Sequence, residues 1–285
     1  MKTISLSDGR AVAYEDNGYS KGTPIFFQHG TSDSRLCKNP DESILKKLKV
    51  RLITTDRPGV GGSSYKKDRT ILDWADDIEQ LADHLEIDTF MVAGHSGGGP
   101  HALGIAKKLG KRVKKVGLAS PLAPFDEPGN KKLVKDRELK MIFHLNHFKF
   151  IAREAAKFEA KAYAADLKKF VQKCAKNYPE DHDVFMGSKL EPMFEAEFAE
   201  AFKNDAIGTL ADFWAFEDWG FKLEEIKQPV TLFYGDADTI LSPESAKHYL
   251  DRMPNLTGCT WPNAGHYGIY DSKHWHGFFQ ALIEV

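Results

Sequence analysis

The sequence predicts an α/β fold whose core is a mostly parallel, doubly wound sheet. The first observation is a set of short apolar runs without a period-2 alternation, which is typical of parallel strands buried on both faces. These runs lie at residues 25–27, 52–54, 90–93, 116–119 and 230–234. The second observation is that helical periodicity separates several of the runs, and alternating strands and helices favour parallel strands joined by right-handed crossovers.

The chain begins with an alternation that predicts an antiparallel hairpin. Ile4 and Leu6 alternate with polar residues ahead of the Asp8-Gly9 pair, and the same pattern resumes at Val12. An Asp-Gly pair between two alternating runs favours a type I′ turn, in which both central residues need φ > 0. We therefore expect an antiparallel start to the sheet.

Two helices are predicted between the apolar runs. Thr70-x-x-Asp73 resembles a capping box, and it stands ahead of an apolar stripe at helical spacing over residues 71–85. A second stripe covers residues 102–109, and Gly110 is placed to end it as a C′ glycine.

Residues 121–219 interrupt the alternation of strands and helices. This stretch has no run that resembles a buried strand, is rich in Lys, Glu, Ala and Phe, and carries Pro128-Gly129 near its entry. We predict a helical cap at 121–219, inserted into a core made of residues 1–120 and 220–285. Its expected place is over the carboxyl edge of the sheet.

The composition excludes several classes of protein. Of the 285 residues, 42% are hydrophobic and 28% are charged, which is close to the globular average and excludes collagen-like and wholly disordered chains. The 39 basic and 41 acidic residues give a net charge of −2. This balance lacks the basic excess of a nucleic-acid binder, so we expect no nucleic-acid partner.

We expect neither a membrane span nor a disulfide framework. The chain has no run of about 18 apolar residues, and its first residues lack an apolar signal core. Cys37, Cys174 and Cys259 are widely spaced and form no C-x-x-C, which fits a reducing compartment. We therefore predict a cytoplasmic protein, and the sequence leaves open whether it is a monomer or a homodimer.

A G-x-S-x-G motif, Gly94-His95-Ser96-Gly97-Gly98, lies between a predicted strand and a predicted helix. A sharp turn at this place exposes the serine hydroxyl above the sheet, and the flanking glycines permit the strained backbone. The helix N-terminus behind the serine favours an oxyanion nearby. A Walker loop would need Gly-Lys-Ser/Thr, and a dinucleotide fingerprint would need its glycines after the first parallel strand. We therefore predict Ser96 as a nucleophile.

A serine nucleophile needs a base to take its proton and a third group to orient that base. His266 follows Gly265 near the C-terminus, where a tight backbone can present the ring toward Ser96. Asp236 and Asp238 follow the run at 230–234 and compete for the orienting role. We favour Asp238, with Asp236 shaping the loop.

Acyl transfer also needs hydrogen-bond donors for the developing oxyanion. The first expected donor is the N–H of Gly97, and the second is the N–H of Thr31 in the loop after the run at 25–27. Asp33, close to this site, is an unexpected acidic group. Either Arg35 neutralises it, or the entry selects against anionic substrates.

Other candidate residues complete the expected site. His29, Gly30 and His95 beside the motifs, and Trp214 and Trp219 of the cap, are expected to contact substrate. Most cap aromatics are expected to pack within the cap, while a subset facing the sheet would line an apolar pocket. Two histidine pairs have spacings that a metal could use, but no third ligand is apparent near either, so we expect no metal site. The pairs are His144 with His147 and His274 with His276.

The motifs resemble those of the α/β-hydrolase fold family, in its cap-bearing serine esterase-like branch. They are His29-Gly30-Thr31, Asp56-Arg57-Pro58-Gly59, Gly94-His95-Ser96-Gly97-Gly98, Gly235-x-x-Asp238 and Gly265-His266. The chain order Ser, Asp, His matches this family. The resemblance covers most of the chain outside the cap. It implies Ser96 as nucleophile, His266 as base, Asp238 as acid, and Thr31 with Gly97 as oxyanion hole.

Two departures narrow the branch. Haloalkane dehalogenases and epoxide hydrolases use an aspartate nucleophile, whereas Ser96 occupies that place here. Proline iminopeptidases look similar around Asp56-Arg57-Pro58-Gly59, but their elbow usually carries a Trp where this sequence has Gly97. We interpret the Asp56 run itself as structural.

The sequence thus predicts a serine hydrolase that cleaves an ester or related carbonyl of a small hydrophobic molecule through an acyl-enzyme. The mechanism requires no metal or organic cofactor. Three alternatives stay open: a carbon–carbon bond hydrolase, an aminopeptidase on the same triad, and a non-catalytic ligand receptor on a hydrolase scaffold. Cofactor-free haloperoxidase or perhydrolase behaviour would be a side activity of the same triad.

Overall fold

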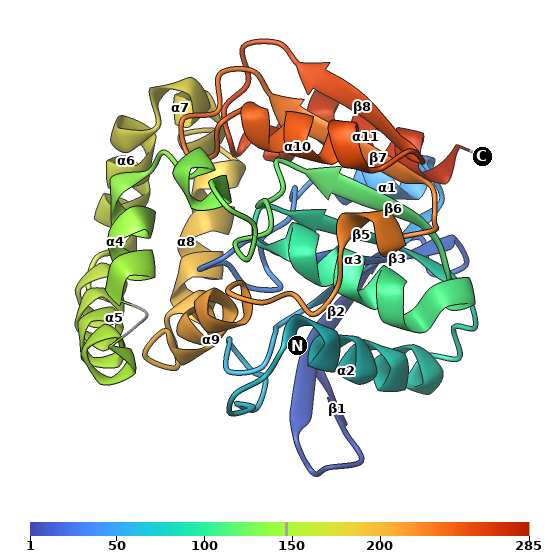
Figure 1. The fold of residues 1–285 in the computed structure, drawn as a ribbon, viewed down its shortest axis with the longest axis horizontal. Helices are drawn as coiled ribbons and strands as arrows, with labels where there is room; N and C mark the ends of the chain where they lie inside the picture. Colours follow the sequence, from blue (N-terminus) through green and yellow to red (C-terminus); the bar gives the residue numbers. More distant parts are fainter. Residues whose placement is uncertain (146–147, 285) are drawn as a thin grey trace.

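Eight strands form one sheet in the computed structural model, which describes residues 1–145 and 148–284. His147 of one histidine pair lies outside the described residues. The strand order is β1-β2-β4-β3-β5-β6-β7-β8 (Figure 1). The strands are β1 (Lys2–Ser5), β2 (Ala11–Gly18), β3 (Thr23–Gln28), β4 (Val50–Thr55), β5 (Phe90–His95), β6 (Val113–Ala119), β7 (Val230–Gly235) and β8 (Leu256–Trp261).

The sheet confirms the predicted strands and their directions. The pairs β1–β2 and β2–β4 are antiparallel, while every pair from β4–β3 to β7–β8 is parallel. The apolar runs correspond to β3 to β7. The edge strand β8 was not among those runs, because most of its residues are exposed or half-buried and it lacks a continuous apolar stretch.

The N-terminal hairpin forms, but the predicted type I′ turn is wrong. Gly9 has a φ of +83°, whereas Asp8 does not adopt a positive φ. The N–H of Gly9 donates to Leu6 O at 2.9 Å, and the N–H of Leu6 donates to Arg10 O at 2.7 Å. The loop is thus one residue longer than a two-residue turn, and only its glycine needs the left-handed region.

Helices cover both faces of the sheet, as a doubly wound fold requires. On one face pack α2 (Ile71–His84), α3 (Gly98–Leu109) and α10 (Glu244–Arg252). On the other face pack α1 (Glu42–Lys47) and α11 (Ser272–Ile283). Each face of the sheet has its own hydrophobic core. Successive residues of a strand point to opposite faces, so Phe26 packs on the face of α2 and α3 and Phe27 on the face of α1 and α11.

The predicted helix boundaries are confirmed at two places. Thr70 caps α2 through the N–H of Asp73, and the Asp73 side chain accepts from the N–H of Thr70, which completes a capping box. Gly110 ends α3 with a φ of +52°.

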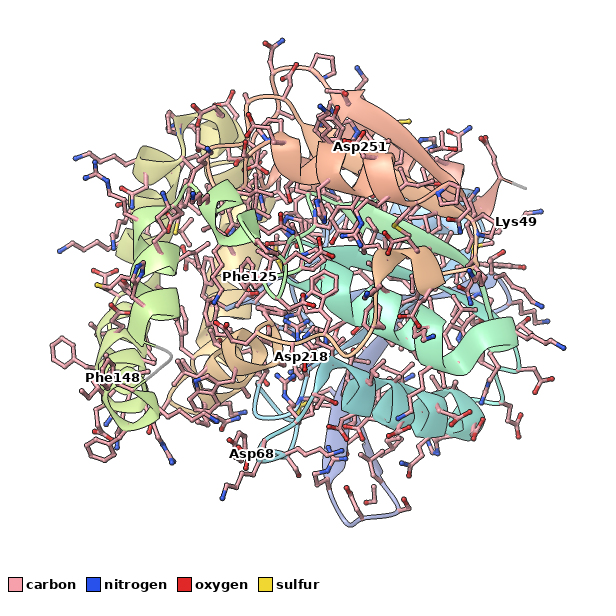
Figure 2. The ribbon with its side chains drawn as sticks, in the orientation of Figure 1. Lys49, Asp68, Phe125, Phe148, Asp218 and Asp251 are labelled. Carbon is pink, nitrogen blue, oxygen red and sulfur yellow. The ribbon has the colours of Figure 1, made fainter. Side chains whose placement is uncertain are left out.

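Between β6 and β7 the described residues form helices rather than strands of the sheet. They are α4 (Arg137–Leu145), α5 (Lys149–Ala164), α6 (Leu167–Asn177), α7 (His182–Phe185), α8 (Leu190–Ala201) and α9 (Ile207–Ala215). These helices stand beside the ends of the strands, toward which the arrowheads point (Figure 1). Figure 2 shows Phe125 and Asp218, on the segments that leave and re-enter the core, between these helices and the sheet. Phe148, ahead of α5, points away from the molecule and is 61% exposed.

No helix in the described ranges combines the length and apolar character that crossing a membrane would require. Cys37, Cys174 and Cys259 form no disulfide.

Candidate active site

The chain turns sharply between β5 and α3, at the G-x-S-x-G motif. Ser96 follows β5 directly and has a φ of +51°, a left-handed conformation that is rare for residues other than glycine. A Cβ atom on Gly94 would collide with Gly98 O, and one on Gly98 would collide with Gln28 O. The two glycines therefore allow the tight turn that presents Ser96 at the end of the sheet.

His266 and Asp238, from the loops after β8 and β7, form a buried pair. His266 Nδ1 lies 2.7 Å from Asp238 Oδ2. Asp238 Oδ1 accepts hydrogen bonds from the N–H groups of Ile240 at 2.9 Å and Leu241 at 2.8 Å. The carboxylate is thereby fixed, and it favours the imidazole tautomer with its proton on Nδ1, which leaves Nε2 able to accept a proton.

Asp236, the other carboxylate of this loop, has a different partner. Its Oδ1 accepts a hydrogen bond from the N–H of Asn263 at 2.6 Å, which ties the loop after β7 to the loop after β8. The structure thus places Asp238, and not Asp236, against the ring of His266.

The surroundings of His266 raise its pKa above the ordinary value of a histidine. Burial favours the neutral ring and acts in the opposite direction. The negative charge and hydrogen bond of Asp238, together with the charges of Asp181 and Asp33, outweigh it. The ring is therefore a stronger base than an exposed histidine.

The loop after β3 lies against the turn at Ser96 because β3 and β5 are neighbouring strands. The chain order reverses at this point, since β4 lies on one side of β3 and β5 on the other. A crevice at such a reversal is the usual ligand site of an open α/β sheet. A Cβ atom on Gly97 would collide with Thr31 Oγ1, so the two residues predicted as the oxyanion hole lie in contact.

One cavity of about 170 Å³ brings together Ser96, Gly97, Thr31 and His266. Its remaining walls are mostly apolar and come largely from the helices between β6 and β7. The apolar lining residues include Leu139, Ile142, Ala152, Ala156, Phe170, Phe198, Phe202, Leu210, Phe213 and Phe216. Polar residues also reach the cavity wall, namely Asp136 ahead of α4, Glu159 of α5, and Lys173 and Asn177 of α6. The cavity thus joins the residues predicted as nucleophile and base to a mostly apolar space.

The comparisons with known proteins decide the family. The family model described as the alpha/beta hydrolase fold matches residues 23–273, which is most of the chain. The chain belongs to the α/β-hydrolase fold family. A solved hydrolase from Pseudomonas aeruginosa PA01 has the same fold, with a TM-score of 0.72 and 16% identity over 100% of this chain and 98% of that chain.

Curated relatives of this α/β hydrolase match over part of their length. It is 34% identical over 128 residues to the non-heme chloroperoxidase of Streptomyces lividans, covering 44% of this chain and 46% of the relative. It is 30% identical over 126 residues to the bifunctional esterase/perhydrolase of Acinetobacter calcoaceticus, with the same two shares of 44% and 46%. The match therefore spans less than half of each relative.

A buried arginine holds the loop after β3, which carries the predicted oxyanion donor Thr31. Arg57 Nη1 donates to His29 O at 2.7 Å, and Arg57 Nη2 donates to Gly30 O at 2.7 Å. Both carbonyls immediately precede Thr31, so the guanidinium fixes the backbone that presents the Thr31 N–H. The Asp56 run, predicted as structural, thus includes a residue that supports the site.

The counter-ion of this arginine is Asp212 of α9, which the sequence analysis did not identify. Arg57 Nη2 lies 2.8 Å from Asp212 Oδ2, and Arg69 Nη2 lies 2.5 Å from Asp212 Oδ1. His101 Nε2 lies 3.1 Å from the same Oδ1. Burial alone would raise the pKa of Asp212, but the two arginines hold it well below the usual range. The signal in the sequence is a single carboxylate within the otherwise apolar helix α9.

The expectation that Arg35 neutralises Asp33 is wrong. Arg35 Nη1 lies 2.5 Å from Asp56 Oδ2 and 2.7 Å from Glu200 Oε1. The Arg35 side chain is therefore engaged by two other carboxylates. Asp33 itself is buried and lines the cavity.

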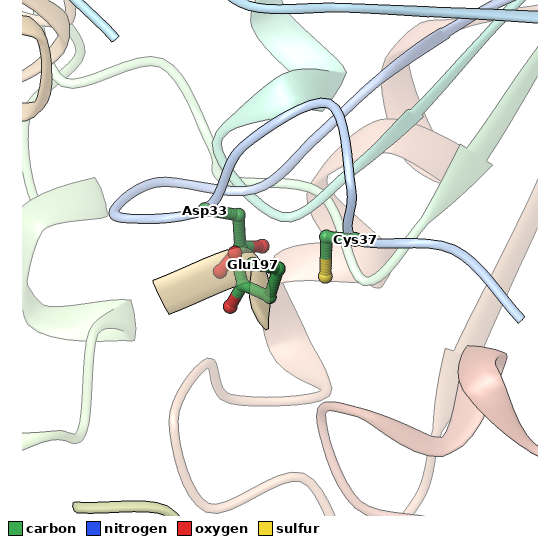
Figure 3. Close-up of side chains that lie close together, drawn as sticks. All are labelled: Asp33, Cys37 and Glu197. Atoms are coloured by element: carbon green, nitrogen blue, oxygen red, sulfur yellow. The ribbon is translucent and has the colours of Figure 1, made fainter. Parts of the chain in front are cut away.

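Asp33 instead belongs to a buried acidic cluster with Cys37 and Glu197 (Figure 3). The oxygen and sulfur atoms that these side chains offer lie within 4.8 Å of one another, close enough to hold a metal ion. Burial raises the pKa of Asp33 to about 6, and it raises the pKa values of Glu197 and Cys37 well above their usual ranges. Burial thus disfavours the charged forms of all three groups, although Asp33, with a pKa of about 6, stays mostly ionised at neutral pH.

The histidines expected to contact substrate lie behind the cavity wall. His29 is buried, and its Nδ1 lies 2.8 Å from the carbonyl oxygen of Gly30. His95 Nε2 lies 3.0 Å from His266 O, and Tyr270 Oη lies 3.2 Å from His95 Nδ1. None of His29, Gly30 and His95 lines the cavity, because their side chains or backbone support the loops that do.

The two tryptophans predicted to contact substrate do not line the cavity either. Trp219 is fully buried and packs against Phe221, with ring centroids 5.8 Å apart. Trp214 lies under Lys149, whose Nζ is 5.0 Å from the ring centroid. Phenylalanines of α6, α8 and α9 form the apolar wall instead.

Proposed function

We propose that this protein is a serine hydrolase that cleaves an ester or related carbonyl bond of a small hydrophobic molecule. The observation that carries the proposal is the shared cavity, into which Ser96 and the Asp238-oriented His266 both open. The family and the relative named as a bifunctional esterase/perhydrolase support hydrolysis as the reaction class. The apolar walls support a hydrophobic substrate.

In the proposed mechanism Ser96 Oγ attacks the substrate carbonyl carbon while His266 Nε2 takes the hydroxyl proton. The N–H groups of Thr31 and Gly97 stabilise the oxyanion of the tetrahedral intermediate. The protonated His266 then donates its proton to the leaving group, and an acyl ester on Ser96 remains. Asp238 stabilises the imidazolium without itself taking the proton.

Water completes the cycle. His266 removes a proton from a water molecule as the water attacks the acyl carbon, and the collapse of the second intermediate releases the carboxylic acid. Ser96 Oγ regains its proton from His266. All proton transfers use residues of this chain, and the steps need no redox partner.

We assign residues 121–219 to a cap that forms the substrate wall, on a core of residues 1–120 and 220–285. A cytoplasmic location and a choice between monomer and homodimer stay predictions, which cell fractionation and sedimentation would test.

The direct test is covalent labelling with a fluorophosphonate, followed by intact mass. We expect one adduct per wild-type chain and none on Ser96→Ala. The matched control is Ser32→Ala, which removes another hydroxyl from the same cavity wall and should still be labelled. A folded wild-type chain without an adduct, or an adduct that persists in Ser96→Ala, would refute the assignment.

A second activity is favoured by the names of two relatives, a chloroperoxidase and an esterase/perhydrolase. In this perhydrolase reaction hydrogen peroxide takes the place of water and attacks the acyl carbon. The bond between that carbon and Ser96 Oγ breaks, the peracid is released, and Ser96 Oγ regains its proton. We expect peracid formation that requires both an ester donor and peroxide, and that disappears in Ser96→Ala. Peracid formation by Ser96→Ala would contradict this route.

A further inference from the structure

The segment between α6 and α7 contacts both loops that carry the proposed acid and base (Figure 1). It includes the short 3₁₀ turn η3 (Pro179–Asp181). Thr239 Oγ1, next to Asp238, lies 3.4 Å from Glu180 Oε2. The N–H of Tyr267, next to His266, donates to Asp181 Oδ2 at 3.0 Å. One turn thus touches the neighbour of each catalytic side chain.

Asp181 is built into this contact. It is 2% exposed, and a Cβ atom on Gly265 would collide with its carboxylate. The residue before His266 is therefore a glycine at the place where the carboxylate lies against the loop. Asp181 Oδ1 has no hydrogen-bond partner although it is buried. Burial of a carboxylate oxygen without a partner is costly, so the contact of Asp181 with the histidine loop points to a role beyond packing.

The charge of Asp181 acts on His266. Burial raises the pKa of Asp181 to about 7, while the N–H of Tyr267 and the proximity of His266 oppose the rise and Asp238 adds to it. Conversely, the charge of Asp181 stabilises the protonated ring of His266, and among the neighbouring charges only that of Asp238 contributes more. The other groups facing His266 include Asp33 and two rings, those of His95 and Tyr267, whose centroids lie 4.9 Å and 5.4 Å from that of His266.

We propose that Asp181 is a positioning residue, which fixes the backbone of the His266 loop from the inserted helices and supplies the base with a second negative charge. The proposal rests on the proposed function of His266. It makes the base depend on contact with the η3 turn, so that displacement of this turn weakens both the placement and the basicity of the ring.

The test is Asp181→Asn, which keeps the shape of the side chain and an acceptor oxygen but removes the charge. We expect the acidic limb of the kcat/KM profile to move about 0.5–1 pH unit lower, because His266 loses a stabilising charge. Asp183→Asn is the matched control, since it removes a carboxylate two residues away that is fully exposed, and it should leave the limb in place. Asp181→Ala, which also removes the acceptor, should lower kcat about tenfold with little change in KM.

A direct measurement separates this proposal from the function it rests on. NMR of the histidine ring protons, followed as a function of pH, gives the pKa of His266 in Ser96→Ala and in Ser96→Ala/Asp181→Asn. This measurement does not require catalytic turnover. We expect the second variant to titrate lower, even if the fluorophosphonate test refutes the serine hydrolase. Should Asp181→Asn not fold, Asp181→Ser keeps a neutral acceptor in the same background. An unchanged His266 titration in a folded, uncharged variant would overturn the proposal.

Discussion

Two buried histidine–aspartate pairs lie on this chain, and they have opposite properties. In the first, His266 Nδ1 lies 2.7 Å from Asp238, whose other oxygen is held by two backbone N–H groups. In the second, His101 Nε2 lies 3.1 Å from Asp212, which also faces Arg57 and Arg69. The first pair opens into the cavity, and the second does not.

The difference is seen in the two histidine pKa values. Burial opposes the charged form of both rings. Asp238 outweighs burial at His266 and raises its pKa, whereas burial, together with Arg57 and Arg69, lowers the pKa of His101 to about 4 although Asp212 acts against it. A carboxylate thus makes a histidine basic only when its charge is not already neutralised by arginines. A histidine–aspartate contact therefore does not by itself identify a catalytic base. The other charges around the aspartate must be considered as well.

The largest expected effect is the loss of activity when Asp238, the carboxylate of the first pair, is replaced. Asp238→Asn should lower kcat about 10⁴-fold, because the amide favours the wrong tautomer of His266 while the geometry is kept. Steady-state kinetics on a short-chain aryl ester measures the loss, with circular dichroism as the control for folding. Retention of more than about a tenth of the wild-type kcat would show that Asp238 does not orient the base.

Replacing Asp212, the carboxylate of the second pair, by asparagine should mainly lower the stability of the fold. Asp212→Asn leaves Arg57 and Arg69 buried without their counter-charge, so we expect a loss of about 3–5 kcal/mol in the free energy of unfolding. Because Arg57 also holds His29 O and Gly30 O, kcat should fall as well, but by less than in Asp238→Asn. Urea denaturation gives the stability. A fully stable Asp212→Asn would contradict the structural role of the pair.

The pH dependence of stability sharpens the contrast, because the two histidines contribute with opposite sign. The folded pKa of His101 is about 4, below its unfolded value, so its contribution is complete above the unfolded pKa and is lost as pH falls toward 4. The folded pKa of His266 is raised, so its contribution is complete below the unfolded pKa and is lost as pH rises through the folded one.

His101→Asn isolates the first contribution. We expect the difference in Tm between wild type and His101→Asn to shrink as pH falls from 7 to 4, since the wild type alone loses the contribution of a neutral His101. Differential scanning calorimetry at several pH values measures it. A difference that stays constant over this range would show that His101 does not titrate with a lowered pKa.

The smallest expected effect concerns the tryptophan placed outside the cavity. Trp214→Phe should change KM by no more than about twofold, because the ring packs under Lys149 and does not line the substrate space. Phe202→Ala, in the cavity wall, is the comparison and should raise KM for a hydrophobic ester. A large KM change in Trp214→Phe alone would show that the substrate contacts the Trp214 ring rather than the cavity wall at Phe202.

The contrast also explains what the sequence could predict. Ser96, Asp238 and His266 follow strands and stand in motifs with glycine, so their local pattern points to the ends of the sheet where the structure brings them together. Asp212 and Arg57 are 155 residues apart, and no local pattern pairs a carboxylate of an inserted helix with an arginine of a core loop. Asp181 was missed for the same reason, because it accepts a hydrogen bond from the backbone N–H of Tyr267, 86 residues away, and no local pattern indicates such a contact.

The errors have physical causes too. Trp214 and Trp219 were assigned to the pocket by residue type, but type alone says neither which face of α9 carries Trp214 nor where the segment after α9 places Trp219. Arg35 stands next to Asp33 in sequence and was expected to pair with it. The loop between them turns the arginine to Asp56 and Glu200, which lie on β4's end and on α8.

The most direct test of the central claim is the pH dependence of the fluorophosphonate labelling rate, compared between His266→Asn and His101→Asn. The account predicts that wild type and His101→Asn label with one ionisation above the ordinary pKa of histidine, about 6.5. In His266→Asn this ionisation should be absent and the rate should fall at least about 10³-fold. Rapid labelling of His266→Asn, or loss of the ionisation in His101→Asn instead, would contradict the account.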